Sequence, residues 1–453
     1  MSPKRLLASA LLGGCVTLAI VAAPATASAV APAASSQPSI PQVSSAQSGG
    51  SWLASQLNSQ GYIPSSSDPS QPDLSATANT ILALASSGVD PSGARAALSY
   101  MENNVNAYVT QDGSDGPAEL GLLVLDAHAL GADPTSFGGT DLVSRLLATQ
   151  QTSGTDTGLF GTETQVADYS AGVYQQGLAL TALAAVGDTG GSQIDEADSW
   201  IENEQCPDGG WTSYENADNP CNGSPADYEG PDTNSTSLAI MGLSAEGALG
   251  SKDAKSAFSF LLGAQDSDGG WGYEPNAAGA PGTTDPDSTA IVIQAILALG
   301  KSPTESDLDG QSANPVAALE SFQITSGSGE GAFTYPGLSG ANTIATYQAV
   351  PAVAGVKFPF NLYVTTSSLP NGTVGSKYSA DLNASGGNPP YSWSLVAGSG
   401  SLPAGLKLKK SGEIEGRPTG SGTSTFTVEV TDTKTTTVPR TVNIGWQVLS
   451  ITT

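Results

Sequence analysis

Six copies of a two-helix unit follow one another through residues 51–360, at a spacing of roughly 42 to 64 residues. The second helix of each copy is the more regular, and in most copies an Asp stands before its first turn. An Asp there accepts the free backbone N–H groups of a helix start, and the Gly that follows each helix suits its end. The six segments start at Asp73, Asp115, Asp168, Asp232, Asp285 and Ala341.

These second helices consist almost wholly of Ala, Leu, Ile, Val, Ser and Thr, so they must be buried on several sides. The first helices are amphipathic: in residues 191–205, Ile194 and Ile201 share an apolar stripe opposite Asp195 and Glu202. We therefore expect six inner helices wrapped by six outer ones and closed into an α/α toroid. The expected outer helices are 51–60, 91–109, 140–151, 191–205, 251–265 and 313–323.

Two connections between these helices share a Gln, a Gly-Gly turn and a Trp. Gln205 precedes Trp211, and Gln265 precedes Trp271, with weaker copies at 157–161 and 331–335. The Gln can bond free carbonyls, the glycines permit a tight turn and the Trp packs between units. The pattern resembles the QW repeats of squalene-hopene cyclase relatives and the repeats of protein prenyltransferase β subunits. The resemblance implies the toroid of the terpenoid cyclase/prenyltransferase superfamily, a fold that enzymes share with non-catalytic carriers.

The chemistry that this resemblance implies is incomplete in the sequence. Class II terpenoid cyclases protonate substrate with the middle Asp of D-x-D-D-T-A, and the string at 285–290 resembles that motif, with Asp287 at the acid position. Ser288 replaces the last acid. Helix capping by Asp285 is the simpler interpretation, because a similar string opens the preceding inner helix at Asp232.

The remaining candidates for a central site are few. A cyclase lines its chamber with aromatic rings, and the inner helices offer Tyr174 and Tyr347 as ligand-binding candidates, together with Asp232. Asp232 paired with Asp285 or Asp287 is also compatible with a sugar-active toroid enzyme.

Metal and triad chemistry have little support. The single histidine, His128, lies in a Leu-rich stretch where helix packing explains it, so neither a zinc set nor a Ser-His-Asp triad can be assembled. The Asp-rich turns 112–116 and 266–270 leave calcium open as a cofactor, although turn chemistry explains them as well. Cobalamin carriers share this type of toroid followed by a small β domain, so the resemblance also leaves cobalamin open as a cofactor.

The amino terminus predicts export. Residues 1–29 combine two basic residues, an apolar run and a small-residue end, which is typical of a secretory signal peptide. Cys15 leaves a lipidation site as an alternative. Residues 30–50 are rich in Ala, Ser, Pro and Gln and predict a disordered linker. In an oxidising exterior, Cys206 and Cys221 are expected to form a disulfide.

Charge limits the partners. Residues 30–360 carry 37 acidic side chains against six Lys or Arg, which makes nucleic acid an improbable partner. Beyond the signal, no stretch has the roughly 20 apolar residues of a membrane span. We expect a monomer, secreted or associated with the cell surface, that meets a small molecule or a surface partner.

Residues 361–453 change to short alternating segments between Gly, Pro and Asn turns, which predicts a β-sandwich with strands at 377–382, 391–395, 406–408, 424–430 and 440–448. The strings at 369–382, 386–395 and 411–419 resemble the immunoglobulin-like, cadherin-related domains of bacterial surface proteins. Such domains space or present another domain.

The leading hypothesis from the sequence is a secreted, non-catalytic binding or surface-interaction protein. The alternative is an enzyme of the cyclase/prenyltransferase class, or a sugar-active one, that works through Asp285 and Asp287.

Overall fold

The structure is a computed structural model. It describes residues 43–111, 113–161, 172–213, 221, 230–275, 284–304, 314–360, 362–364, 366, 369–386, 390–432 and 437–447. The predicted signal peptide and the first part of the predicted linker lie outside these residues.

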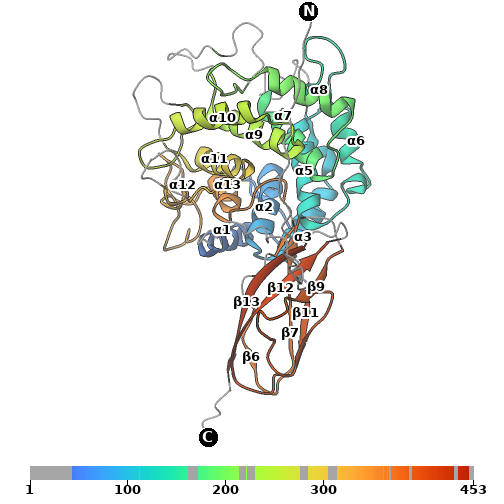
Figure 1. Cartoon of the computed structure of the whole chain (residues 1–453), viewed down its shortest axis with the longest axis vertical. Helices are drawn as coiled ribbons and strands as arrows, with labels where there is room; N and C mark the ends of the chain where they lie inside the picture. Colours follow the sequence, from blue (N-terminus) through green and yellow to red (C-terminus); the bar gives the residue numbers. More distant parts are fainter. Residues whose placement is uncertain are drawn as a thin grey trace, which may run out of the picture. The chain divides into compact units, whose positions relative to one another are not determined.

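Six inner helices form a closed ring, as the repeat predicts. Each packs against the next in chain order, and the last, α13, packs against the first, α2, so the ring has no free end (Figure 1). Closure matters because an open array would leave the apolar faces of its end units uncovered. The inner helices are α2 (Leu74–Ser87), α5 (Pro117–Leu130), α7 (Val173–Ala185), α9 (Thr233–Glu246), α11 (Pro286–Ala298) and α13 (Thr343–Val353).

The outer helices differ more from expectation. The first begins at Val43, so the predicted linker is wrong over 43–50; Ala46 and Ser45 are buried there against the last repeat. The second is broken at Asn103 and Asn104, whose side-chain amides donate to carbonyls of the preceding turn. The outer helices are α1 (Val43–Gln56), α3 (Pro91–Glu102) with α4 (Val105–Val109), α6 (Leu142–Leu147), α8 (Ser192–Asn203), α10 (Ser251–Gly263) and α12 (Pro315–Glu320).

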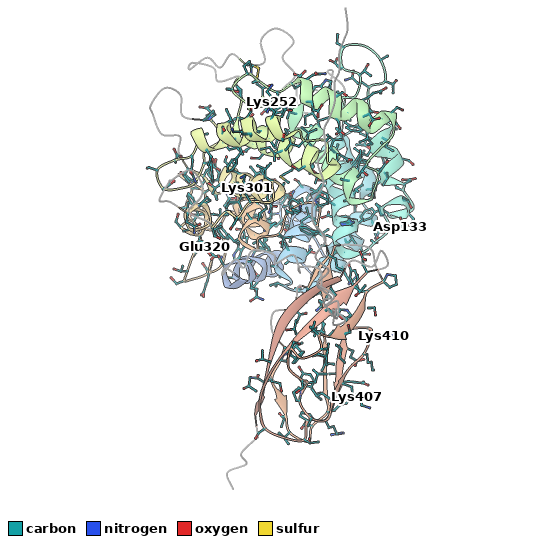
Figure 2. The ribbon with its side chains drawn as sticks, in the orientation of Figure 1. Asp133, Lys252, Lys301, Glu320, Lys407 and Lys410 are labelled. Atoms are coloured by element: carbon teal, nitrogen blue, oxygen red, sulfur yellow. A yellow bond between two sulfur atoms is a disulfide. The ribbon has the colours of Figure 1, made fainter. Side chains whose placement is uncertain are left out.

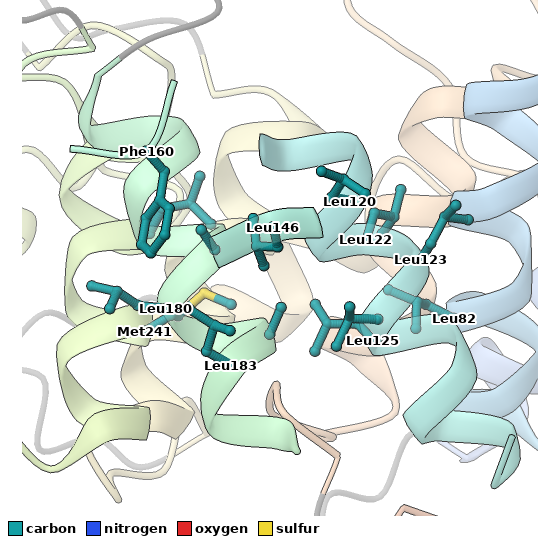
Figure 3. Close-up of a cluster of buried hydrophobic side chains, with 14 of the residues drawn as sticks. Leu82, Leu120, Leu122, Leu123, Leu125, Leu146, Phe160, Leu180, Leu183 and Met241 are labelled. Carbon is teal, nitrogen blue, oxygen red and sulfur yellow. The ribbon is translucent and has the colours of Figure 1, made fainter. Parts of the chain in front are cut away.

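The core fills the space between the rings. Figure 3 shows part of it, in which Leu120 and Leu123 of α5 and Leu180 and Leu183 of α7 belong to one buried cluster. The helices α7 and α9 approach so closely at Gly177 that a Cβ atom there would lie 2.3 Å from the carbonyl oxygen of Leu238.

The four connections in which this sequence pattern recurs share one geometry, which we call the joint. In each, a Gln at the end of an outer helix donates to a Gly carbonyl of its own turn, and a buried aromatic residue follows. The four joints pair Gln150 with Phe160, Gln205 with Trp211, Gln265 with Trp271 and Gln323 with Phe333.

Three of these glutamines also donate to a carbonyl of the next outer helix or its start, at Gln193, Asp253 and Ser45. The hydrogen bond from Gln323 to the Ser45 carbonyl connects the sixth repeat to the first and so stabilises the closed ring. The backbone N–H of each joint aromatic donates to the fourth residue of the following inner helix, namely Gln176, Thr236, Thr289 and Thr346. The glutamine and tryptophan residues thus act between repeats.

The carboxyl-terminal domain is a β-sandwich, as predicted. A four-stranded sheet in the order β6-β13-β12-β9 and a three-stranded sheet in the order β10-β11-β7 enclose a core that includes Trp393, while Tyr391 is only partly buried. Four strands were not predicted: β5, β6, β8 and β11. The strands are β5 (Tyr363–Val364), β6 (Gly372–Thr373), β7 (Tyr378–Asp381), β8 (Ala384–Ser385), β9 (Ser392–Leu395), β10 (Leu406–Leu408), β11 (Glu413–Gly416), β12 (Gly422–Thr431) and β13 (Thr437–Gln447).

Minor elements lie in the loops of the helical domain. They are two β-hairpins, β1 (Ile63–Pro64) with β2 (Pro72–Asp73) and β3 (Thr110–Gln111) with β4 (Ser114–Asp115), and the 3₁₀ turn η1 (Pro134–Ser136). Charged side chains such as Asp133, Lys252 and Lys301 are exposed (Figure 2). Within the part of the chain that the structure describes, no helix combines the length and apolar character of a membrane span.

Candidate functional site

A chamber of about 260 Å³ lies inside the ring and is lined by all six inner helices. Most of its wall is apolar, with Leu82, Leu125 and Met241 among the lining residues visible in Figure 3. Nine of the twenty lining residues carry polar side-chain atoms, and such a combination of an apolar wall with polar groups suits a small-molecule site. The polar and aromatic lining residues are Ser75, Asn79, Tyr108, Glu119, Tyr174, Gln175, Gln294, Tyr347, Gln348 and Phe358.

One end of the chamber is acidic, and we call it the acidic end. Tyr174 is 38% exposed, yet the pKa of its hydroxyl is raised by desolvation and by the nearby carboxyls of Asp232, Asp287 and Glu119. These residues stand at the amino-terminal ends of α7, α9, α11 and α5, so those four helix starts meet at the same end.

Asp285 and Asp232 cap their helices. Asp285 is 6% exposed; its Oδ1 accepts the backbone N–H of Ser288 at 2.7 Å and its Oδ2 accepts the Ser288 hydroxyl at 2.9 Å. Asp232 is 1% exposed and accepts the N–H of Ser235 at 2.7 Å. Burial raises the pKa of Asp232 to about 6, although hydrogen bonds from Ser235 and Ser213 act to lower it.

Asp287 has a different environment. It lies one turn before Ala290 and Ile291, which line the chamber, and so shares their face of α11. Its Oδ1 is buried without a hydrogen-bond partner in the described structure. Burial, and then the neighbouring Asp285, raise the pKa of Asp287 to about 7. Near neutral pH this carboxyl therefore holds its proton for much of the time and can donate it.

The structure brings together most of the residues that the sequence singled out. Tyr174 and Tyr347 both line the chamber, and the pKa of Tyr347 is raised by burial and by Tyr174, Asp287 and Asp73. Asp232 lies close enough to influence Tyr174 but is engaged in its cap.

The sequence reasoning missed eight of the polar and aromatic chamber residues, namely Ser75, Asn79, Tyr108, Glu119, Gln175, Gln294, Gln348 and Phe358. Tyr108 belongs to the outer helix α4, yet it lines the chamber. Glu119 and Gln294 lie on inner helices whose composition looked uniformly apolar. The pKa of Glu119 is raised by burial. A polar residue inside an otherwise apolar inner helix is the signal that could have marked both.

The other sequence candidates lie elsewhere. His128 lies on α5, and its Nε2 is hydrogen-bonded to the Phe360 carbonyl oxygen at 2.9 Å. Cys206 and Cys221 form a disulfide. In the turn 266–270, Asp266 and Asp268 both accept the Thr284 hydroxyl; the turn 112–116 lies partly outside the described residues. Among the described residues, no group of three or more His, Cys, Asp or Glu side chains is placed to hold a metal ion.

Comparison with family models divides the chain in the same way. Residues 130–329 match the squalene-hopene cyclase C-terminal domain, and residues 360–447 match the family described as "Putative Ig domain". No curated protein matches the sequence.

Solved structures with similarity include the type II terpene cyclase MstE from Scytonema, at 15% identity over 70% of this chain and 98% of that one, with a TM-score of 0.46. The ent-copalyl diphosphate synthase from Streptomyces platensis is 18% identical over 62% of this chain and 49% of that one, with a TM-score of 0.40. A "putative alpha-galactosidase" from Bacteroides fragilis is 24% identical over 19% of this chain, with a TM-score of 0.17, and this chain spans only 17% of its length.

The two family models agree with the closed ring and the β-sandwich described above. The chain joins a helical ring, of which residues 130–329 are similar to the squalene-hopene cyclase C-terminal domain, to a β-sandwich that is similar to an immunoglobulin-like domain.

Proposed function

We propose that this is a secreted binding protein whose helical domain holds a small, mainly apolar molecule in the axial chamber. The observation that carries the proposal is the chamber itself, because every inner helix contributes to its lining. A volume of about 260 Å³ suits roughly ten non-hydrogen atoms, by scaling from a 150 Å³ cavity that takes benzene. The immunoglobulin-like domain would then space or present the binding domain.

The acidic end is the proposed entrance. In the described part of the helical domain, the large apolar side chains with more than a third of their surface exposed are Tyr174, Tyr273, Leu338 and Ile344. Tyr174 and Ile344 stand in the first turns of α7 and α13, and Tyr273 bonds the Ser213 hydroxyl beside Asp232. Exposed apolar side chains around an opening favour the entry of an apolar ligand.

A titration of the chain with 2-naphthol, a fluorescent molecule of about the right size, tests the proposal. Ala290→Leu should abolish binding, because the larger side chain fills the chamber wall, whereas Ala96→Leu on the exposed face of α3 should leave binding unchanged. Failure of 2-naphthol and of its parent hydrocarbon to bind, or equal binding by the Ala290 variant, would overturn the proposal.

Acid-initiated catalysis is a second candidate, favoured by Asp287 beside the chamber, because its Oδ1 is buried without a hydrogen-bond partner in the described structure and its pKa is about 7. Its proton would add to a carbon–carbon double bond, and a second double bond of the substrate would capture the resulting cation. The cyclic cation would then lose a proton to the Asp287 carboxylate, which regenerates the acid. The net reaction is an isomerisation. Incubation with geraniol, followed by gas chromatography, would show a cyclic isomer that Asp287→Asn abolishes without a change in melting temperature; absence of any such product from the parent protein would rule this candidate out for ten-carbon substrates.

A further inference from the structure

Gln294 is the polar residue of the chamber that the described structure leaves unsatisfied. It stands on α11 two turns beyond Asp287, is 3% exposed and lines the chamber. Neither its Oε1 nor its Nε2 has a hydrogen-bond partner among the described residues. Burial of an amide without partners is unfavourable, because the amide loses its bonds to water and gains none in return.

The electrostatic surroundings restrict what could satisfy this amide. None of the described lining residues is Lys, Arg or His. The titratable groups at the acidic end are the carboxyls of Glu119, Asp232, Asp285 and Asp287 and the chamber tyrosines, and burial raises the pKa of each of these four carboxyls. An anionic ligand would therefore enter an apolar site with no cation to balance it. A hydroxyl group can both accept from Nε2 and donate to Oε1.

We propose that Gln294 is a ligand-recognition residue and that the chamber selects an uncharged molecule of about ten non-hydrogen atoms bearing one group that both donates and accepts a hydrogen bond. This inference rests on the proposed binding function. The rise of an α-helix places Gln294 about 10 Å from Asp287 along the axis of α11. The polar group of the ligand lies against Gln294, and its apolar body extends toward the acidic end.

Four probes with one ring system separate the alternatives: naphthalene, 2-naphthol, 2-naphthoate and 2-naphthylmethylammonium. Their dissociation constants are measured by fluorescence titration of the whole chain at pH 6. We expect 2-naphthol to bind at least tenfold more tightly than naphthalene and 2-naphthoate. Gln294→Leu, a substitution of similar size, should reduce the preference for 2-naphthol over naphthalene to within about twofold while naphthalene binds as before.

Gln60→Leu is the matched control, because Gln60 is exposed and does not line the chamber. It should leave the 2-naphthol preference within twofold of its original value. The assignment is overturned if Gln294→Leu preserves the preference, if Gln60→Leu removes it, or if the ammonium or the carboxylate binds most tightly. Should the leucine variant fail to fold, Gln294→Met gives the same comparison. Binding of naphthalene in every variant with no preference would refute the role of Gln294 alone, whereas no binding by any probe would refute the proposed function.

Discussion

The joints between repeats and the lining of the chamber lie only a few turns apart, yet they are built differently. At the joints, the same contacts recur: a Gln bonded to a Gly carbonyl, a buried aromatic ring, and a polar residue at the fourth position of the next inner helix. In the chamber, corresponding turns of the helices present unlike residues, such as Asn79, Leu122, Leu178, Ile291 and Gln348.

This difference separates architecture from recognition. A contact that recurs in successive repeats stabilises the closed ring, because every repeat must pack against its neighbour in the same way. Gln294 and Asp287 have no counterpart at the same turn of α9, where Met241 and Asn234 stand. Residues that depart from the repeat and face the chamber are therefore the ones to test for function.

The largest expected effect is at a joint. Trp271 is fully buried, and its Nε1 donates to the Leu261 carbonyl at 2.6 Å. Trp271→Ala should lower the free energy of unfolding by about 3–5 kcal/mol, because it leaves a large cavity. Trp271→Phe should cost clearly less, since Phe160 and Phe333 fill the same position in other joints. Chemical denaturation measures both, and similar losses for the two variants would show that the joints are not equivalent.

The second-largest expected effect is a dependence of stability on pH, which comes from the chamber side of α11 and not from the joints. The pKa of Asp287 is about 7 in the folded chain against 3.8 for the unperturbed group, so the folded state binds more protons between these values. Stability should accordingly fall as pH rises through this window, by roughly 2–3 kcal/mol from this group between pH 5 and 7.

Asp287→Asn should flatten that fall, as measured by unfolding at pH 5, 6, 7 and 8. Asp285, Tyr174, Tyr335 and Tyr347 are the titratable groups that interact with Asp287. The control is Asp133→Asn, because hydrogen bonds from Thr135 lower the pKa of that exposed carboxyl and place its titration below the window. An unchanged slope in the Asp287 variant would contradict the assigned environment.

The sequence alone predicted the ring of helices and the two joints that contain tryptophan, because both depend on patterns that repeat along the chain. It could not show that Tyr108, on an amphipathic outer helix, lines the chamber, since that contact depends on the break between α3 and α4. Nor could it show that Asp285 is satisfied by its cap whereas Asp287, two positions later, has a buried Oδ1 without a hydrogen-bond partner in the described structure. Burial of an individual side chain depends on packing from several repeats at once.

A third prediction concerns the turn of a joint. Gly158 has φ +103°, and a Cβ atom there would lie 2.1 Å from the Glu196 carbonyl oxygen of α8. Gly154 in the same loop has φ +99° but open space around it. Both alanine variants carry the backbone strain of about 1–2 kcal/mol, and Gly158→Ala should cost about 1–3 kcal/mol more through the clash. Equal melting temperatures would mean that the contact between repeats can relax.

The smallest effect is at a cap. Asp285→Ala should cost about 0.5–2 kcal/mol in unfolding free energy, because Ser288 loses its acceptor. Asp285→Asn keeps an accepting oxygen and should retain most of that stability. The alanine variant should also lower the pKa of Asp287, since Asp285 is one of the two causes that raise it. An Asp285→Ala variant as stable as the parent would contradict the assignment of Asp285 as a helix cap.

The most direct test of the ligand chamber is a crystal structure of the chain soaked with 6-bromo-2-naphthol, in which the anomalous signal of bromine locates the molecule. The account predicts a bromine site inside the closed ring of inner helices, with the hydroxyl within hydrogen-bond distance of the Gln294 amide. A molecule bound only outside the ring, or inside it with its hydroxyl away from Gln294, would contradict the account.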